Sequence, residues 1–256
     1  MQSRSSISIA AGLLMVMGLT AQANATLTVQ NFWHMGEDGL NNPSDSVGGK
    51  NFNDGFSTQV DTAVHAPGST ASVYYNGFAG NYMDNPTDGP TVPATNFVLE
   101  LYVNLHTLDG CNIASLGTGT SGWAKIGFSG NNFFFGRENE AYGALDSHVP
   151  TVDTWYHLAF VQYGGLIHGF VNGVAADLPN YDNPTASTGN NGQMHIGVKP
   201  GGGQNLNGWV DNVRFSTFAE GQFNPNDLLV NAVPEPATML GLGLGVAAML
   251  RRRKRA

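Results

Sequence analysis

The sequence predicts an all-β protein folded as an antiparallel sandwich of two stacked sheets. It contains 34 glycines and only 12% charged residues, which is typical of many turns between short strands. Residues 97–105 alternate strictly and place every second side chain on one apolar face. No segment between residues 26 and 230 has a sustained helical period. About ten short strands separated by turn signals favour a two-sheet sandwich.

The most informative stretch is residues 155–173, WYHLAFVQYGGLIHGFVNG. Gly164-Gly165 fits a two-residue primed turn, and this turn fixes the register of the hairpin. Leu158 then lies opposite Val171 on the expected core face, which also carries Tyr156, Phe160, Gln162, Ile167 and Gly169. The other face should look outward; its members are His157, Ala159, Val161, Tyr163, Leu166, His168, Phe170 and Asn172. Asn172-Gly173 is a second turn signal, so another strand should begin at Val174.

The remaining strands follow from short apolar or alternating runs bounded by turn residues. The expected strands cover 27–35, 73–75, 97–105, 113–116, 123–128, 133–136, 194–198 and 209–215. Residues 76–96 contain three prolines and should form a long loop, as should the polar residues 178–192. Asn131-Asn132 is a hairpin candidate. In the last strand Val210 is out of phase with Val213 and Phe215, and a β-bulge at Asp211-Asn212 would place all three in the core.

The charge distribution excludes one class of partner. Residues 26–230 hold five basic and eighteen acidic side chains, a net charge of 5 − 18 = −13. Such a domain does not attract phosphate backbones, so no nucleic-acid partner is expected. The single cysteine, Cys111, excludes an intrachain disulfide, and its burial and reactivity stay open.

The N-terminus reads as a secretory signal peptide over residues 1–25. Arg4 precedes an apolar run from Ile7 to Leu19, and the small residues Ala23 and Ala25 form an A-x-A site for signal peptidase. We expect a signal helix here and a mature chain that begins near Thr26. A buried helix at the chain start is the alternative.

The C-terminus, residues 231–256, has three consecutive features. Pro234, Glu235 and Pro236 are followed by an apolar run over 237–250 and by five basic residues. Fourteen residues form only a short membrane helix, marginally sufficient if the arginines snorkel. The positive-inside rule keeps the basic end in the cytoplasm and residues 26–230 outside the inner membrane.

This tail resembles the PEP-CTERM sorting signal. The resemblance implies recognition of Pro234, Glu235 and Pro236 by an exosortase, transient anchoring in the inner membrane and removal of the tail. The product would reach the cell surface or extracellular matrix of an exopolysaccharide-producing Gram-negative bacterium. A plain C-terminal membrane anchor is the alternative.

A second resemblance covers about residues 32–217. Its motifs, in order, are WHMGED at 33–38, FVLELYV at 97–103, WYHLA at 155–159, FVNG at 170–173 and GWVDNVRF at 208–215. This order is similar to a LamG-type domain, which implies the concanavalin A-like jelly roll for residues 26–230. LamG-type domains often hold a structural Ca²⁺ where the first and last strands meet. The resemblance therefore suggests calcium bound by Asp38 and Asp211 with backbone carbonyls, beside Glu37. Solvated carboxylates next to a turn are the alternative.

Catalysis is not expected. Glu138 and Glu140 are the only close pair of glutamates, and a loop position is the simpler interpretation of them than an acid/base pair. The Glu-x-Asp-x-x-Glu signature of the glucanases with this fold is absent. His157 and His168 lie too far apart along the predicted hairpin to share a metal.

Sugar binding by loops is the remaining possibility, since aromatic faces stack on sugar rings and Asn and Asp bind hydroxyls. Tyr181, Asp182 and Asn183 have this mixture, and so do Asn76, Phe78, Tyr82 and Asp84. Turn residues chosen for the backbone are the alternative. The sequence thus predicts a non-catalytic surface protein with a structural or adhesive role; a lectin-like module that binds extracellular polysaccharide and a diverged glycoside hydrolase are the alternatives.

Overall fold

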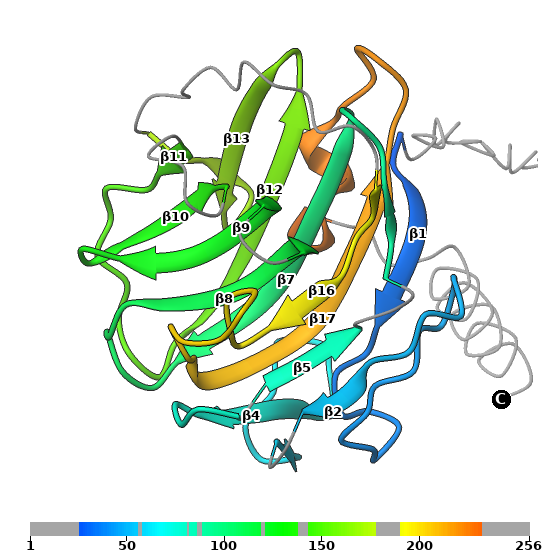
Figure 1. Cartoon of the computed structure of the whole chain (residues 1–256). Helices are drawn as coiled ribbons and strands as arrows, with labels where there is room; N and C mark the ends of the chain where they lie inside the picture. Colours follow the sequence, from blue (N-terminus) through cyan, green and yellow to red (C-terminus); the bar gives the residue numbers. More distant parts are fainter. Residues whose placement is uncertain are drawn as a thin grey trace, which may run out of the picture.

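The computed structural model describes residues 26–55, 58–80, 82–85, 89–118, 121–137, 143–177 and 190–231. These residues form two antiparallel sheets stacked face to face (Figure 1). The expected signal helix and membrane helix both lie outside the described residues. Within the described ranges, no helix is long and apolar enough to cross a membrane.

The first sheet has β7 and β17 at its centre, and β1 (Thr28–Trp33) also pairs with β17. Its other strands, in spatial order, are β14 (Val174–Ala175), β13 (Leu166–Val171), β12 (Trp155–Tyr163), β7 (Phe97–Leu105), β17 (Asn207–Thr217), β4 (Ser72–Asn76) and β3 (Gln59–Asp61).

The second sheet is built mainly from the middle of the chain. Its order is β11 (Gly143–Leu145), β10 (Asn132–Gly136), β9 (Ser121–Ser129), β8 (Cys111–Thr118), β16 (Met194–Ile196), β5 (Tyr82–Asn85) and β2 (Asn53–Gly55). A separate pair joins β15 (Asn190–Asn191) to β6 (Thr91–Val92). Two 3₁₀ turns, η1 (Pro225–Asp227) and η2 (Leu229–Asn231), follow the last strand. The architecture is the expected jelly-roll sandwich.

The predicted hairpin is confirmed residue by residue. Strands β12 and β13 pair from Leu158 opposite Val171 to Tyr163 opposite Leu166. Gly164 and Gly165 both have positive φ, +59° and +77°, as a type I′ turn requires. The second turn and the short strand β14 are confirmed as well.

The bulge predicted in the last strand is also confirmed. The register of β17 against β7 shifts between Asp211 and Arg214, and Asn212 has φ +47°. As a result Val210, Val213 and Phe215 all reach the core between the sheets.

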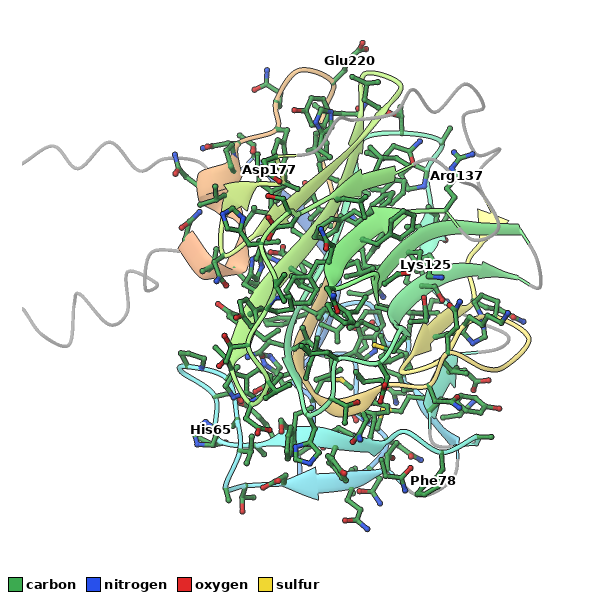
Figure 2. The ribbon with its side chains drawn as sticks, turned by 90° about the vertical axis from the view of Figure 1, so that its left-hand side faces the viewer. His65, Phe78, Lys125, Arg137, Asp177 and Glu220 are labelled. Atoms are coloured by element: carbon green, nitrogen blue, oxygen red, sulfur yellow. The ribbon has the colours of Figure 1, made fainter. Side chains whose placement is uncertain are left out.

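The expectation that the second face of the hairpin looks outward is wrong. His157, Ala159, Val161 and Phe170 on this face are buried. The chain after β17 folds back across the first sheet, and Leu228 packs in this second apolar cluster. Figures 1 and 2 show the two short helical turns of this segment beside the first sheet, on the side away from the second sheet. Residues 218–231 have no regular hydrophobic period, so their packing against this face cannot be predicted from the sequence.

The expectation of a structureless loop over residues 76–96 is also wrong. Strand β5 pairs with β16 and β2, and β6 pairs with β15. The two residues of β15 lie within 178–192, the second segment that was expected to be a loop. Pro90 and Pro93 lie directly outside β6 and therefore do not interrupt its pairing. The β9–β10 turn is centred on Gly130-Asn131, one residue before the expected pair.

Candidate functional site

The outer face of the second sheet carries a row of polar side chains across five strands. We call Lys125, Ser115, His195, Asp84 and Asn53 the outer row. Each lies directly opposite the next across a strand pair. Because successive residues of a strand point to opposite faces, their apolar strand neighbours fill the core. The row is therefore a direct result of alternation in these strands.

A hollow of about 270 Å³ lies at the Asp84 end of this row. We call it the His195 hollow; it is lined by Tyr82, Asp84, His195, Val198, Lys199, Gly201 and Gly202. Tyr82 and Asp84 were candidates for sugar binding, and the structure places them on strand β5 instead of a loop. A phenol ring, a carboxylate, an imidazole and an ammonium group thus border one cavity.

His195 is the most informative side chain in this hollow. The residue is 8% exposed, and its Nε2 atom has no hydrogen-bond partner within the described structure. Burial lowers the pKa of His195, although nearby Asp84 opposes this shift. Burial in turn raises the pKa of Asp84, opposed by His195. A buried polar atom without a partner is costly.

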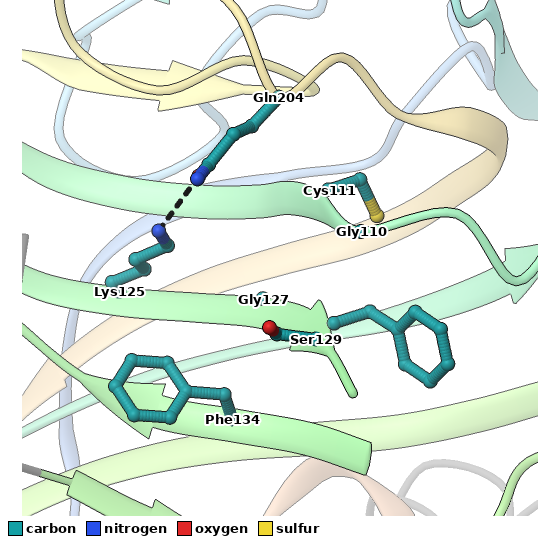
Figure 3. Close-up of a pocket in the computed structure, with 8 residues that line it drawn as sticks. Gly110, Cys111, Lys125, Gly127, Ser129, Phe134 and Gln204 are labelled. Carbon is teal, nitrogen blue, oxygen red and sulfur yellow. Dashed lines mark hydrogen bonds between the residues drawn. The ribbon is translucent and has the colours of Figure 1, made fainter. Parts of the chain in front are cut away.

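A second hollow of about 200 Å³ lies on the same face, at the Lys125 end of the row (Figure 3). We call it the Phe134 hollow; its lining includes Gly110, Cys111, Lys125, Gly127, Ser129, Phe134 and Gln204. A Cβ atom at Gly127 would lie 3.0 Å from the carbonyl oxygen of Cys111, so the floor beside the Phe134 ring is backbone. Burial raises the pKa of the Cys111 thiol to about 12, which disfavours its thiolate form at neutral pH.

The glycine-rich turn after β16 separates the two hollows. Lys125 Nζ donates to Gln204 Oε1 at 2.8 Å, and the backbone of Lys199 pairs with Gly202 and Gly203. The three glycines of this turn, 201–203, all have positive φ, so the turn depends on them. The turn brings Lys199 to the same face as Lys125.

The proposed calcium ligands occupy different environments. Asp38 accepts the backbone N–H groups of Leu40 and Ser44 in an exposed loop. Asp211 is fully buried beside the bulge and accepts the N–H of Ala66 at 3.0 Å. Glu37 accepts from Ser69 Oγ. Asp38 and Asp211 belong to no cluster of three close metal-ligand side chains in the described part of the chain.

Burial raises the pKa of Asp211 to about 6, partly offset by hydrogen bonds with Ala66, Ser69 and Asn212. Its Oδ1 atom has no clear hydrogen-bond partner. Burial favours the protonated form of the Asp211 carboxyl group, and a bound cation could neutralise the carboxylate in place of the proton. Calcium binding at Asp211 therefore stays a proposal.

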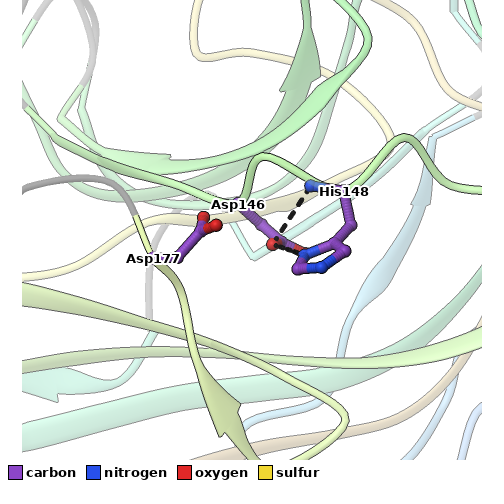
Figure 4. A group of neighbouring side chains, drawn as sticks. All are labelled: Asp146, His148 and Asp177. Atoms are coloured by element: carbon purple, nitrogen blue, oxygen red, sulfur yellow. Dashed lines mark hydrogen bonds and ion pairs between the residues drawn. The ribbon is translucent and has the colours of Figure 1, made fainter.

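A different cluster was not found from the sequence: Asp146, His148 and Asp177 (Figure 4). His148 Nδ1 lies 2.7 Å from Asp146 Oδ1, and this contact raises the pKa of His148. Asp177 accepts from the backbone N–H and hydroxyl of Ser147, which lowers its pKa. Asp146 bonds His148 and Asp177 bonds Ser147, so these contacts connect Asp177 to the loop after β11.

The other candidate residues from the sequence either lie outside both hollows or lie outside the described residues. His157 is buried and bonds Glu100, whereas His168 stacks on Tyr163, so both are packed histidines. Phe78 is 74% exposed on the loop after β4 and lines neither hollow. The remaining candidates lie outside the described residues: Tyr181, Asp182 and Asn183, Glu138 and Glu140, Ala23 and Ala25, and Pro234, Glu235 and Pro236.

Two stacked antiparallel sheets in a jelly roll define a class of β-sandwich proteins that includes both lectins and glycoside hydrolases. Residues 77–220 match the family described as the concanavalin A-like lectin/glucanases superfamily, with a laminin G-type domain, and the chain belongs to it. Residues 232–255 match the PEP-CTERM protein-sorting motif, which implies export to the surface and processing by an exosortase. No curated protein matches the chain.

Solved structures share this fold at low sequence identity. Domain 4 of the extracellular arabinanase AbnA from Geobacillus stearothermophilus, in complex with arabinotriose, has 18% identity and a TM-score of 0.62, with 80% of this chain and 98% of that domain covered. The botulinum neurotoxin serotype D ligand-binding domain in complex with N-acetylneuraminic acid has 13% identity and a TM-score of 0.56. That match covers 82% of this chain and 51% of the toxin domain, so the chain spans about half of it. Trypanosoma rangeli sialidase has 14% identity and a TM-score of 0.56, with 81% of this chain and 32% of the sialidase covered.

Proposed function

We propose that this protein is an exported surface or matrix component whose jelly-roll domain holds polysaccharide without cleaving it, in a structural or adhesive role. The observation that carries the proposal is the outer row with a hollow at each end. Aromatic rings border both hollows, and the turn between them supplies the polar side chains of Lys199 and Gln204, which suits a chain of sugar rings and hydroxyls. The sugar ligands of the arabinanase domain and of the toxin domain are in keeping with this proposal.

A non-catalytic role is the better interpretation of this face. Most glycoside hydrolases cleave the glycosidic bond with two carboxyl groups that flank it. In the described lining of the two hollows, Asp84 is the one carboxylate. A diverged hydrolase would release reducing sugar from a bound polysaccharide, so a reducing-end assay on bound glucans separates binding from cleavage.

The binding proposal is tested by affinity electrophoresis of the exported protein in gels that contain soluble polysaccharides. We expect retardation that His195→Ala and Tyr82→Ala weaken about tenfold, as the loss of one good stacking or hydrogen-bonding contact predicts. Phe78→Ala is the matched control, since it removes an exposed aromatic side chain outside the hollows. Equal retardation of all variants would contradict the site, and no retardation in any gel would contradict the function.

The sorting proposal has a separate test. Signal peptidase and an exosortase would leave a mature chain that begins near Thr26 and ends near Pro234 to Pro236. Intact-mass measurement of the protein recovered from the cell surface checks both ends at once. A full-length chain in the cytosol would contradict this processing.

A further inference from the structure

Two lysines of the domain lie beside the outer row. Residues 26–230 contain only five basic side chains, and Arg214 pairs with the buried Glu100. Lys125 on β9 and Lys199 after β16 line the two hollows, whereas Arg137, directly after β10, is buried. Figure 2 shows Lys125 on the side opposite the two helical turns. A domain with a net charge of −13 thus has one lysine at each hollow of this face.

The turn between the hollows contacts both lysines. Lys125 Nζ donates to Gln204, and a Cβ atom at the adjacent Gly203 would lie 3.7 Å from Lys199 Cε. Lys199 lines the His195 hollow and Lys125 lines the Phe134 hollow. Each hollow thus combines an aromatic ring with one ammonium group.

Asp84 is the described carboxylate that lines the His195 hollow, and it faces His195 across the strand pair. Burial raises the pKa of Asp84, so Asp84 loses its negative charge at a higher pH than an ordinary sugar carboxylate does. Burial lowers the pKa of His195, so its imidazole stays neutral to a lower pH than usual. The repulsion between Asp84 and an anionic ligand therefore weakens first as the pH falls.

We propose that the outer row binds a carboxylated, uronate-type polysaccharide, with Lys125 and Lys199 contacting carboxylates and Tyr82 and Phe134 contacting ring faces. This inference rests on the proposed function and specifies its ligand. Strands β9 and β5 carry Lys125 and Tyr82 and lie three strand spacings apart, about 14 Å at ordinary spacing. A small anion cannot bridge that distance, whereas several linked sugars can. The acidic remainder of the domain repels polyanions, so binding must come from this face.

The experiment uses the full exported protein and two forms of one polymer, polygalacturonate and its fully methyl-esterified, uncharged derivative. We expect binding to polygalacturonate to be at least about tenfold tighter, to weaken as salt rises from 50 to 500 mM, and to fall about tenfold in a Lys125→Gln/Lys199→Gln double variant. Lys50→Gln is the matched control, because Lys50 lies outside the row and accepts the Trp33 indole N–H through its backbone carbonyl. Melting curves verify that each variant is folded.

The outcomes separate the two proposals. Equal binding to both polymers, or an unchanged double variant, would overturn the charged-ligand inference and leave polysaccharide binding intact. Absence of binding to these polymers and to neutral glucans alike would overturn the proposed function itself.

Discussion

At the scale of single residues, the buried Asp211 links stability to pH. Its pKa is raised to about 6 in the folded protein and lies near 3.8 in the unfolded chain. Between these values the folded state binds the extra proton, so stability falls as the pH rises from about 4 to about 6 and stays low above that. The ionised carboxylate costs about 3 kcal/mol at neutral pH when no cation is bound.

The neutral variant Asp211→Asn tests this. We expect it to be more stable than wild type at pH 7.5 in the presence of EGTA, by up to about 3 kcal/mol in urea unfolding, and to lose the advantage below pH 4. Added Ca²⁺ should stabilise wild type and leave the variant unchanged if Asp211 is a calcium ligand. A wild type that does not respond to calcium would argue against the metal site, and a pH-independent difference would argue against the raised pKa.

Glu100 is another buried carboxylate, and it is fully hydrogen-bonded. It receives hydrogen bonds from His157 Nε2 at 2.9 Å, from Arg214 Nε at 2.7 Å and from the backbone N–H of Leu229 at 2.8 Å. Burial raises its pKa, but Arg214 and His157 outweigh this and hold the pKa below its ordinary value. Its stabilising effect is therefore present above the unfolded pKa and is lost as the pH falls through the folded one.

Glu100→Gln should destabilise the protein by about 3–5 kcal/mol at pH 7, because it leaves the Arg214 guanidinium buried without its counter-charge. The midpoint of urea unfolding measures this. Glu220→Gln, at an exposed position, serves as the control and should change stability by less than about 0.5 kcal/mol. An equally small loss of stability in both variants would contradict a stabilising role of the Glu100–Arg214 ion pair.

At the scale of secondary-structure elements, Gly169 on β13 of the first sheet lies directly against Phe135 of the second sheet. A Cβ atom there would overlap the ring of Phe135, which enters the core from β10. Gly169→Ala should therefore cost about 1–3 kcal/mol, the usual effect of overpacking a core. Gly110→Ala is the control, since its new Cβ would meet only ordinary contacts. Equal unfolding midpoints for the two variants would contradict this packing.

The elements that sequence reasoning found are those specified by local signals. The register of the β12–β13 hairpin could be predicted because Gly164-Gly165 fixes its turn. The bulge at Asp211-Asn212 could be predicted because Val210 is out of phase with Val213 and Phe215. Strand β5 was missed because its four residues lie among prolines and become a strand only by pairing with β16 and β2.

The same reason explains what was missed in the candidate site. Tyr82 and Asp84 were selected by residue type, but His195, Lys199 and Lys125 join them only through pairings between strands distant in the sequence. Neither the alternation nor the spacing of residues within one segment shows which distant strands pair with one another. The face of β12 carrying His157 was misassigned for a related reason, since its cover comes from residues after β17.

At the scale of the whole molecule, the two ends of the described chain meet beside the first sheet. Both the backbone nitrogen and the hydroxyl of Thr26 lie 2.6 Å from Asp227 Oδ2. The Asp227 carbonyl oxygen in turn accepts from Arg214 at 2.7 Å. Thr26 is the expected first residue of the mature protein, and the sorting motif begins at residue 232, directly after the docked turn η2.

This contact predicts that signal-peptide removal strengthens the docking of the C-terminal segment. Cleavage after Ala25 would turn the Thr26 amide into an ammonium group, so a hydrogen bond to Asp227 becomes an ion pair. Asp227→Asn should then lower stability by about 0.5–1 kcal/mol in the processed protein and by less in a form that keeps its signal residues. The difference should disappear well above pH 8, where an ordinary α-amino group loses its charge.

Melting temperatures of the four proteins, processed and unprocessed with and without Asp227→Asn, measure this coupling as a double-mutant cycle. Asp109→Asn, at an exposed carboxylate on another loop, controls for the general loss of negative charge. An equal effect of Asp227→Asn in both forms would show that the contact is an ordinary hydrogen bond that does not depend on processing. A larger effect in the processed form would mean that removal of the signal peptide strengthens the contact between Thr26 and Asp227. This contact lies close to residue 232, where the sorting motif begins.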